Sequence, residues 1–211
     1  SNGTASVEYT AGVVPGTVTV TAKTTEEMHI GSVYLTLVDA VISSVSVKSG
    51  SLSGNVPADG LSETLITATI VDSANNPVQD GTVVTFSTTA GKFCTSGLSC
   101  STTVNASTAN GAATVMLRSS ENAGTATITA LSGGVSGTTT LNFVPGSVGR
   151  IKLSASPESL QSGGTSTITA SVTDAHGNPV NGETITFSIS GNGTLSSQTA
   201  TTADGTASVT Y

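Results

Sequence analysis

Two stretches of this chain decide its fold because each echoes the other: DSANNPVQDGTVVTF at residues 72–86 and DAHGNPVNGETITF at residues 174–187. The aspartates that open them are 174 − 72 = 102 positions apart, and the phenylalanines that close them are 187 − 86 = 101 positions apart. A unit of about one hundred residues is too long for a solenoid repeat and has the size of an independent domain. A shorter echo occurs three times, as NGTASVEY (2–9), NGAATVML (110–117) and DGTASVTY (204–211).

Around these repeats, apolar and polar residues alternate with a period of two, which is typical of half-buried β-strands. Asn-Gly, Asp-Gly and Gly-Gly dipeptides separate the alternating runs and indicate tight turns. No window has the apolar spacing of a helix. The sequence therefore predicts an all-β sandwich or barrel. The clearest predicted strands are ETLITATIVD (63–72), TVVTFS (82–87), AATVML (112–117) and GTATITAL (124–131).

The phase of the repeat predicts one whole unit and two partial ones. In the usual lettering of sandwich strands, residues 1–42 would form strands E to G of a first domain, beginning with the strand NGTASVEY. Residues 43–145 would form a complete domain, and residues 146–211 strands A to E of a third. The joins are short, and Pro145 and Gly146 mark the second of them. Such short linkers predict a semi-rigid rod.

Composition excludes several classes of protein. Of the 211 residues, only 9 % are charged and 3 % are aromatic, and none is Trp. Lys and Arg together number six, and the net charge is −7. Nucleic-acid binding needs a concentrated basic face, so no nucleic-acid partner is expected. No apolar run approaches the ~18 residues of a membrane span, and no signal peptide is recognisable at the start. With two His, two Cys and no nucleophile, metalloprotease or phosphate-loop motif, neither an enzyme nor a cofactor is expected.

The repeated motifs resemble those of the group 1 bacterial immunoglobulin-like domains, found in the stalks of invasin and intimin surface adhesins. The resemblance lies in the D-x-x-x-N-P-V motif at residues 72–78 and 174–180, and in the T-F-S that follows each copy. The N/D-G-x-A-x-V strand and AGTATITA (123–130) complete it. It implies tandem immunoglobulin-like β-sandwich domains in a secreted or surface-exposed bacterial protein. The segment AKTTEEMHIGSVYLTL (22–37) departs from the pattern as a longer, more charged hairpin.

Superposing the repeats predicts the buried residues. Phe86 stands on strand C, where antibody domains place a Trp, and no cysteine pair joins the two sheets. The fold must therefore be stabilised mainly by aliphatic burial. In the complete unit the predicted core is Ile66, Ala68, Ile70, Val84, Phe86, Ala113, Val115, Leu117, Ala126 and Ile128. In the third unit it is Ile168, Ala170, Val172, Ile185, Phe187, Ala207, Val209 and Tyr211.

Cys94 and Cys100 lie in KFCTSGLSC, within an insertion of the complete unit. A structural disulfide that closes a small loop is the favoured interpretation, since a metal site of this kind takes four ligands and no His is near in sequence. Half of a metal site and a redox pair are the alternatives. A disulfide implies an oxidising compartment, and therefore an extracellular or bacterial cell-surface location.

Four residues of the repeated motif are candidate Ca²⁺ ligands, because carboxylate and amide oxygens suit that ion. The simpler interpretation is an Asx-turn, in which the carboxylate accepts backbone N–H groups. We prefer the turn, since Ca²⁺ takes six to eight oxygens and acids are sparse here. His176 has Ala74 as its counterpart, which favours a solvated side chain. The four candidates are Asp72, Asn76, Asp174 and Asn178.

Three functions are compatible with these patterns. The first is a stalk that spaces an adhesive or other functional domain from the cell. The second is adhesion to a host or cell-surface protein or glycan, with a contact hairpin formed by Lys23, Glu26, Glu27 and His29. The third is a head-to-tail fibre, in which strands F and G of one chain complete the third unit of another. The simpler interpretation of the partial units, which we prefer, is that the chain is a segment of a longer array. Neighbouring immunoglobulin-like domains, of the same chain or of another copy, are the expected partners throughout.

Overall fold

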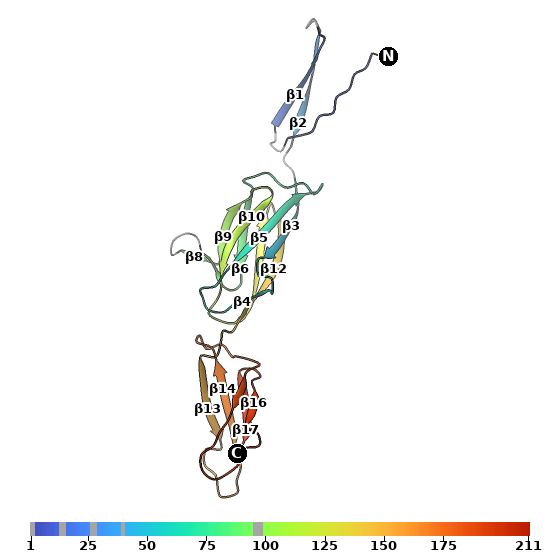
Figure 1. Cartoon of the computed structure of the whole chain (residues 1–211). Coiled ribbons are helices and arrows are strands. Elements are labelled where there is room, and N and C mark those ends of the chain that lie inside the picture. Colours follow the sequence, from blue (N-terminus) through green and yellow to red (C-terminus); the bar gives the residue numbers. More distant parts are fainter. Residues whose placement is uncertain (1–2, 13–15, 26–28, 39–40, 95–98) are drawn as a thin grey trace.

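The computed structural model describes residues 3–12, 16–25, 29–38, 41–94 and 99–211. They form an all-β structure with three parts that follow one another along one long axis (Figure 1). The first part is a hairpin of β1 (Gly16–Lys23) and β2 (Ile30–Leu37), and two sandwiches follow it. No helix occurs among the described residues, and so none that could cross a membrane.

The middle part is a complete two-sheet sandwich. One sheet has the strand order β3-β5-β10-β7-β8 and the other β4-β12-β11-β6-β9, which correspond to the ABED and GFC sheets of a sandwich of this type. All neighbours pair antiparallel except β4 and β12. The strands are β3 (Ile42–Ser49), β4 (Asn55–Pro57), β5 (Glu63–Asp72), β6 (Val83–Thr88), β7 (Lys92–Cys94), β8 (Cys100–Ser101), β9 (Thr103–Ser107), β10 (Ala112–Arg118), β11 (Gly124–Ser132) and β12 (Val135–Val144).

The core of this sandwich lies between its two sheets and contains most of the predicted residues. Val115 is the exception, since it is only partly buried at the edge of the core. Three large core residues were not predicted: Phe93, Leu141 and Phe143. The rings of Phe86 and Phe93 meet edge to face with centroids 6.2 Å apart, so Phe86 packs against a second aromatic ring that was not expected.

The last part is a smaller sandwich with a three-stranded sheet, β13-β14-β17, and a two-stranded sheet, β15-β16. Its core repeats that of the first sandwich, but the predicted Ile168 and Tyr211 are only partly buried. Tyr211 instead donates its hydroxyl to the Asn192 carbonyl at 2.6 Å. The strands are β13 (Arg150–Ser156), β14 (Thr167–Thr173), β15 (Thr184–Thr186), β16 (Thr199–Thr201) and β17 (Thr206–Thr210).

In each sandwich the proline of the repeated motif packs against the glycine of the repeated Asn/Asp-Gly turn. Asn110 and Asp204 have φ of 51° and 48°, and each is followed by a glycine with positive φ, as a tight β-hairpin requires. A Cβ on Gly111 would lie 2.6 Å from Cβ of Pro77, and one on Gly205 would lie 2.6 Å from Cβ of Pro179. The Pro of Asn-Pro-Val therefore needs the Gly of the turn, which explains why both recur together.

The predicted strand at residues 2–9 is wrong for the part that is described, because residues 4–12 carry no strand. In the two sandwiches the equivalent strands, β10 and β17, pair with β5 and β14. The strand pairs formed by the described residues do not include residues 5–12. The same sequence pattern thus forms a strand only where a neighbouring strand completes its hydrogen bonds.

Candidate functional site

The first copy of the repeated motif forms an exposed Asx-turn. The Asp72 carboxylate accepts the backbone N–H of Ala74 at 2.8 Å and that of Asn76 at 2.9 Å. The side-chain amide of Asn76 also donates to it, at 3.2 Å. Hydrogen bonding to the charged form, chiefly from the Asn76 backbone, lowers the pKa of Asp72. The carboxylate thus holds the turn between β5 and the following Pro.

The second copy forms the same turn but is buried. Asp174 and Asn178 are 3 % and 6 % exposed. The Asp174 carboxylate accepts N–H groups from His176 and Asn178, each at 2.9 Å, and from Gly146 at 3.1 Å. Burial by itself raises the pKa of Asp174, but hydrogen bonds from Asn178, Gly146 and His176 outweigh it and lower the pKa to about 2. The Gly146 bond fixes the linker between the sandwiches to this carboxylate.

The Asn178 side chain connects the two sandwiches. Its amide nitrogen donates to the Glu121 carbonyl at 2.8 Å, and its amide oxygen accepts the Ala123 N–H at 2.7 Å. Both acceptor and donor lie in the loop between β10 and β11 of the first sandwich. The same amide nitrogen donates to Asp174 at 2.9 Å, so both of its hydrogens are used. We call the group of Glu121, Ala123, Gly146, Asp174 and Asn178 the junction clamp.

The close approach of the linker to the second sandwich also depends on Gly149. A Cβ at that position would lie 2.6 Å from the Ala175 nitrogen and 2.8 Å from the Asp174 carbonyl carbon. The Gly149 N–H donates to the Thr173 carbonyl at 2.9 Å. A small cleft of about 160 Å³ remains beside this contact. It is lined by Pro57, Ala58, Asp59, Gly146, Ser147, Asp174, Ala175 and His176.

The four Ca²⁺ candidates are placed in two separate turns. Within each turn the carboxylate oxygens face N–H donors, which is the Asx-turn geometry that the sequence favoured. The ranges that the structure describes contain no group of three or more His, Cys, Asp or Glu arranged to hold a metal ion. Both copies of the motif therefore form the Asx-turn.

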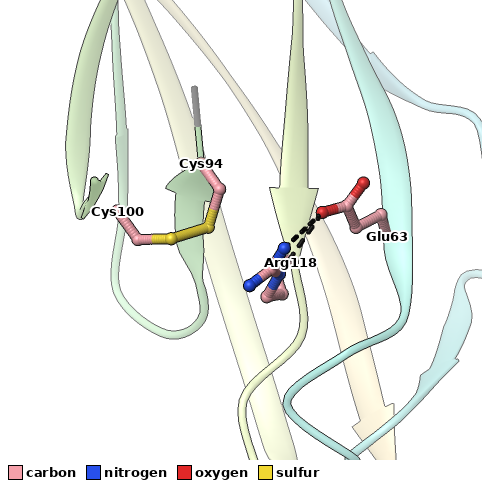
Figure 2. The surroundings of a disulfide bond; sticks show 4 residues. All are labelled: Glu63, Cys94, Cys100 and Arg118. Atoms are coloured by element: carbon pink, nitrogen blue, oxygen red, sulfur yellow. Dashed lines mark hydrogen bonds and ion pairs between the residues drawn. A yellow bond between two sulfur atoms is a disulfide. The ribbon is translucent and has the colours of Figure 1, made fainter. Parts of the chain in front are cut away.

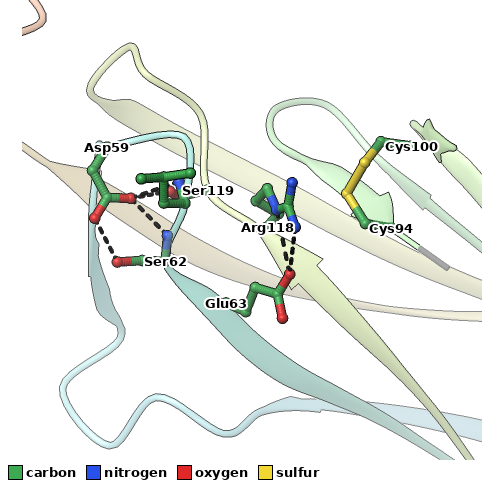
Figure 3. A network of polar contacts seen from close by, with 8 residues as sticks. Asp59, Ser62, Glu63, Cys94, Cys100, Arg118 and Ser119 are labelled. Atoms are coloured by element: carbon green, nitrogen blue, oxygen red, sulfur yellow. Dashed lines mark hydrogen bonds and ion pairs between the residues drawn. A yellow bond between two sulfur atoms is a disulfide. The ribbon is translucent and has the colours of Figure 1, made fainter. Parts of the chain in front are cut away.

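A second carboxylate network, which the sequence did not point to, closes the same end of the first sandwich (Figure 3). The Asp59 carboxylate accepts the N–H groups of Leu61 and Ser62, at 2.9 and 2.7 Å, and the hydroxyls of Ser62 and Ser119, at 2.7 and 2.9 Å. These bonds, with the Ser62 backbone first, hold the pKa of Asp59 well below its ordinary value. Asp59 thereby joins the turn before β5 to the end of β10.

Cys94 and Cys100 form the predicted disulfide, which joins β7 to β8 at the edge of the first sandwich (Figure 2). Nearby, the Arg118 guanidinium donates to the Glu63 carboxylate at 3.0 Å. Both side chains are more than one third exposed, so this pair contributes at most about 1 kcal/mol. An open cleft of about 580 Å³ is lined by both cysteines and by Arg118. It is lined by Gly60, Gly91, Lys92, Cys94, Cys100, Arg118, Ser119, Ser120, Glu121 and Asn122.

The predicted contact hairpin is only partly described. Glu26 and Glu27 lie outside the described residues. Lys23 ends β1, and His29 precedes β2, with the Thr24 N–H donating to the His29 carbonyl at 3.1 Å. The structure thus places Lys23 and His29 at the same end of the hairpin.

The family is decided by a match over most of the chain. Residues 46–144 and 151–211 match the model of the bacterial Ig-like domain (group 1). The chain belongs to this family. The two matched segments correspond to the two sandwiches, so the chain carries tandem bacterial Ig-like domains, and the predicted fold and resemblance are confirmed.

Among solved structures, similarity to bacterial Ig-like proteins extends over most of this chain. Invasin, described as a bacterial integrin-binding protein, is 23 % identical with a TM-score of 0.65, and the match covers 93 % of this chain and 40 % of invasin. InvD of Yersinia pseudotuberculosis is 25 % identical with a TM-score of 0.53, covering 78 % of this chain and 48 % of InvD. This chain therefore spans less than half the length of either. A search of curated proteins finds no match.

Proposed function

We propose that this chain is a non-enzymatic stalk segment of a secreted or cell-surface bacterial protein, and that it spaces an adhesive or other functional domain from the cell. The observation that supports this most directly is the junction clamp. A spacer transmits distance only if its domains keep a fixed orientation, and inter-domain motion is the default unless the interface prevents it. Here three side-chain hydrogen bonds cross the junction or fix its linker.

The clamp is suited to this role because its groups are shielded from water. Exposed polar contacts exchange with solvent and contribute little, whereas a buried amide that lost its partners would leave unsatisfied polar groups. Asn178 is buried and all its donors and acceptors are used across two domains. Bending the junction must therefore break several bonds together. The disulfide between Cys94 and Cys100 fits the oxidising environment outside the cell.

The proposal is tested by the relative orientation of the two sandwiches in solution. Residual dipolar couplings of the 211-residue chain should fit a single alignment tensor for both sandwiches, and small-angle scattering should give an extended particle. Asn178→Ala should split the couplings into two different tensors. Asn76→Ala is the matched control, since Asn76 has the same place in its motif but bonds only within its own turn. Independent tensors in the unaltered chain would remove the basis of the stalk proposal.

A further inference from the structure

The disulfide of the first sandwich belongs to a hairpin that has no counterpart in the second. From the phenylalanine of the repeated motif to the Asn/Asp-Gly turn, the first copy spans 110 − 86 = 24 positions and the second 204 − 187 = 17. The longer copy contains β7 and β8, which carry Cys94 and Cys100. In the shorter copy, all of which the structure describes, no strands equivalent to β7 and β8 occur between β15 and β16. A sandwich of this type therefore forms without the disulfide.

The disulfide lies at the edge of its sheet, and the chain on either side of it is held by other contacts. Among the described strands β8 pairs with β7 alone, through two residue pairs. Before the disulfide, Phe93 is fixed in the core by its pairing with Leu117 of β10 and by its contact with the Phe86 ring. After the disulfide, β9 pairs with β6 over five residues. Opening the S–S bond is therefore a local event that leaves both sheets in place.

The S–S bond can be reached from solvent. Cys94 and Cys100 are both partly exposed, and both line the open cleft of about 580 Å³. Reactive cysteines lie in partly exposed, positively charged surroundings, whereas structural cysteines that are fully buried are inert. The charge of this cleft therefore decides how the disulfide reacts.

The cleft is lined by two cations and one carboxylate, that of Glu121. Lys92 and Cys94 are two residues apart on β7 and so point to the same face of the sheet, and Arg118 of β10 pairs with Lys92. Arg118 shares its charge with Glu63 (Figure 2), whereas Lys92 has no ion-pair partner among the described residues. In a chain of net charge −7, this is a local excess of positive charge beside the disulfide.

We propose that Cys94 and Cys100 form a thiol–disulfide exchange site, at which a small, negatively charged thiol is captured covalently. The incoming thiolate attacks Sγ of Cys100, on the edge strand, and forms a mixed disulfide with it. The bond between Cys100 and Cys94 breaks, and its electron pair stays on Sγ of Cys94, which leaves as a thiolate. The incoming sulfur is oxidised as the Cys94 sulfur is reduced, so the step consumes no other oxidant or reductant.

The polarity of this step follows from the order of the strands. Cys100 lies on β8, the outermost strand of the sheet, and is attacked from outside. Cys94 lies on the strand that carries Lys92, and a neighbouring cation stabilises a thiolate. A thiol whose thiolate is stabilised is the better leaving group. The same lysine attracts an anionic thiol into the cleft. The proposal does not depend on the stalk role, which concerns the orientation of the two sandwiches.

The test compares three thiols with the same two-carbon skeleton and different charges: 2-mercaptoethanesulfonate, 2-mercaptoethanol and cysteamine. Each reacts with the folded chain at low salt, and the products are trapped with N-ethylmaleimide and mapped by mass spectrometry. Captured chains should carry the thiol on Cys100 and the maleimide on Cys94. Each rate is divided by the rate of the same thiol with an uncharged reference disulfide, which removes its intrinsic reactivity. The sulfonate should then exceed the neutral thiol about five-fold, the Boltzmann factor for two opposite unit charges about 4 Å apart in water. Cysteamine should be the slowest.

A matched pair of variants tests the charge. Lys92→Gln should remove most of the preference for the sulfonate, whereas Lys48→Gln should keep it. Lys48 is an exposed lysine of β3 in the same sheet, so both variants change the net charge equally. Raising the salt concentration should weaken the preference in the unaltered chain. Equal preferences in the two variants would overturn the proposal, as would an adduct on Cys94 or a folded chain whose disulfide does not react.

Urea below the unfolding transition separates exchange in the folded chain from exchange after unfolding. The proposed reaction starts from the folded sandwich, so its rate should stay constant while the unfolded fraction rises. A rate that increases in proportion to the unfolded fraction would show that the disulfide is closed to thiols in the folded chain, and the proposal would be wrong.

Discussion

The junction clamp predicts that two asparagines in the same motif differ sharply in importance. Asn178→Ala removes two hydrogen bonds across the junction and one to Asp174, whereas Asn76→Ala removes only the bond to Asp72. A hydrogen bond contributes about 0.5–1.5 kcal/mol net to stability. The two bonds across the junction therefore amount to about 1–3 kcal/mol, and this is the expected excess of Asn178→Ala over Asn76→Ala. This additional loss of stability in Asn178→Ala should come from weaker coupling between the two sandwiches.

The measurement is hydrogen exchange followed residue by residue, together with denaturant unfolding. In the unaltered chain the Ala123 amide should be protected, because it donates to the Asn178 side chain. In Asn178→Ala that amide should exchange about 10-fold faster or more, since 1.4 kcal/mol corresponds to a factor of ten in an opening equilibrium. Strand amides of β11 should be unchanged. If Ala123 exchanges equally in both variants, or if both variants lose the same stability, the bonds to Asn178 do not hold the junction.

Three further outcomes are expected. Phe86→Ala, which empties a fully buried site against Phe93, should destabilise the first sandwich by about 3–5 kcal/mol in denaturant unfolding and leave the second unchanged. Replacing both cysteines by serine should cost about 2–3 kcal/mol in the same assay, the loop-closure value for a sequence separation of six. The pKa of Asp174 is lowered from 3.8 to about 2, so its contribution to stability is complete above pH 4 and is lost as the pH falls through 2. The melting temperature of the second sandwich should therefore be steady above pH 4 and fall as the pH is lowered toward 2. Asp174→Asn should reduce this dependence of the melting temperature on pH.

The strands could be predicted where the alternation of apolar and polar residues coincides with a stretch that has a neighbouring strand to pair with. The predicted strand at residues 63–72 is β5 with identical bounds, because its alternating residues face the core and solvent in turn. Phe93 was missed for a physical reason: it lies in a strand of three residues beside the disulfide, too short to show alternation. The failure at residues 4–9 has the opposite cause. Its alternation is clear, but a strand requires a partner, and the sequence does not specify that partner locally.

The two uses of the repeated motif explain why the clamp could not be predicted. The Asx-turn is local, since donor and acceptor are four residues apart, and it appears in both copies. The junction contact instead depends on what lies opposite the turn. Asn76 and Asn178 have the same neighbours, Pro and Val, yet only Asn178 is buried. What distinguishes Asn178 from Asn76 is therefore its burial against the preceding domain, which the local sequence does not encode.

The junction clamp can be kept in an array of repeated domains even where the sequences of the connecting loops differ. Asn178 bonds to the backbone carbonyl of Glu121 and the backbone N–H of Ala123, so it does not depend on either side chain. Every residue except proline supplies that N–H, and every residue supplies the carbonyl. The loop before β11 can therefore change its sequence without loss of the joint. What cannot change is the amide that binds these groups and the glycine, Gly149, that lets the linker approach the turn.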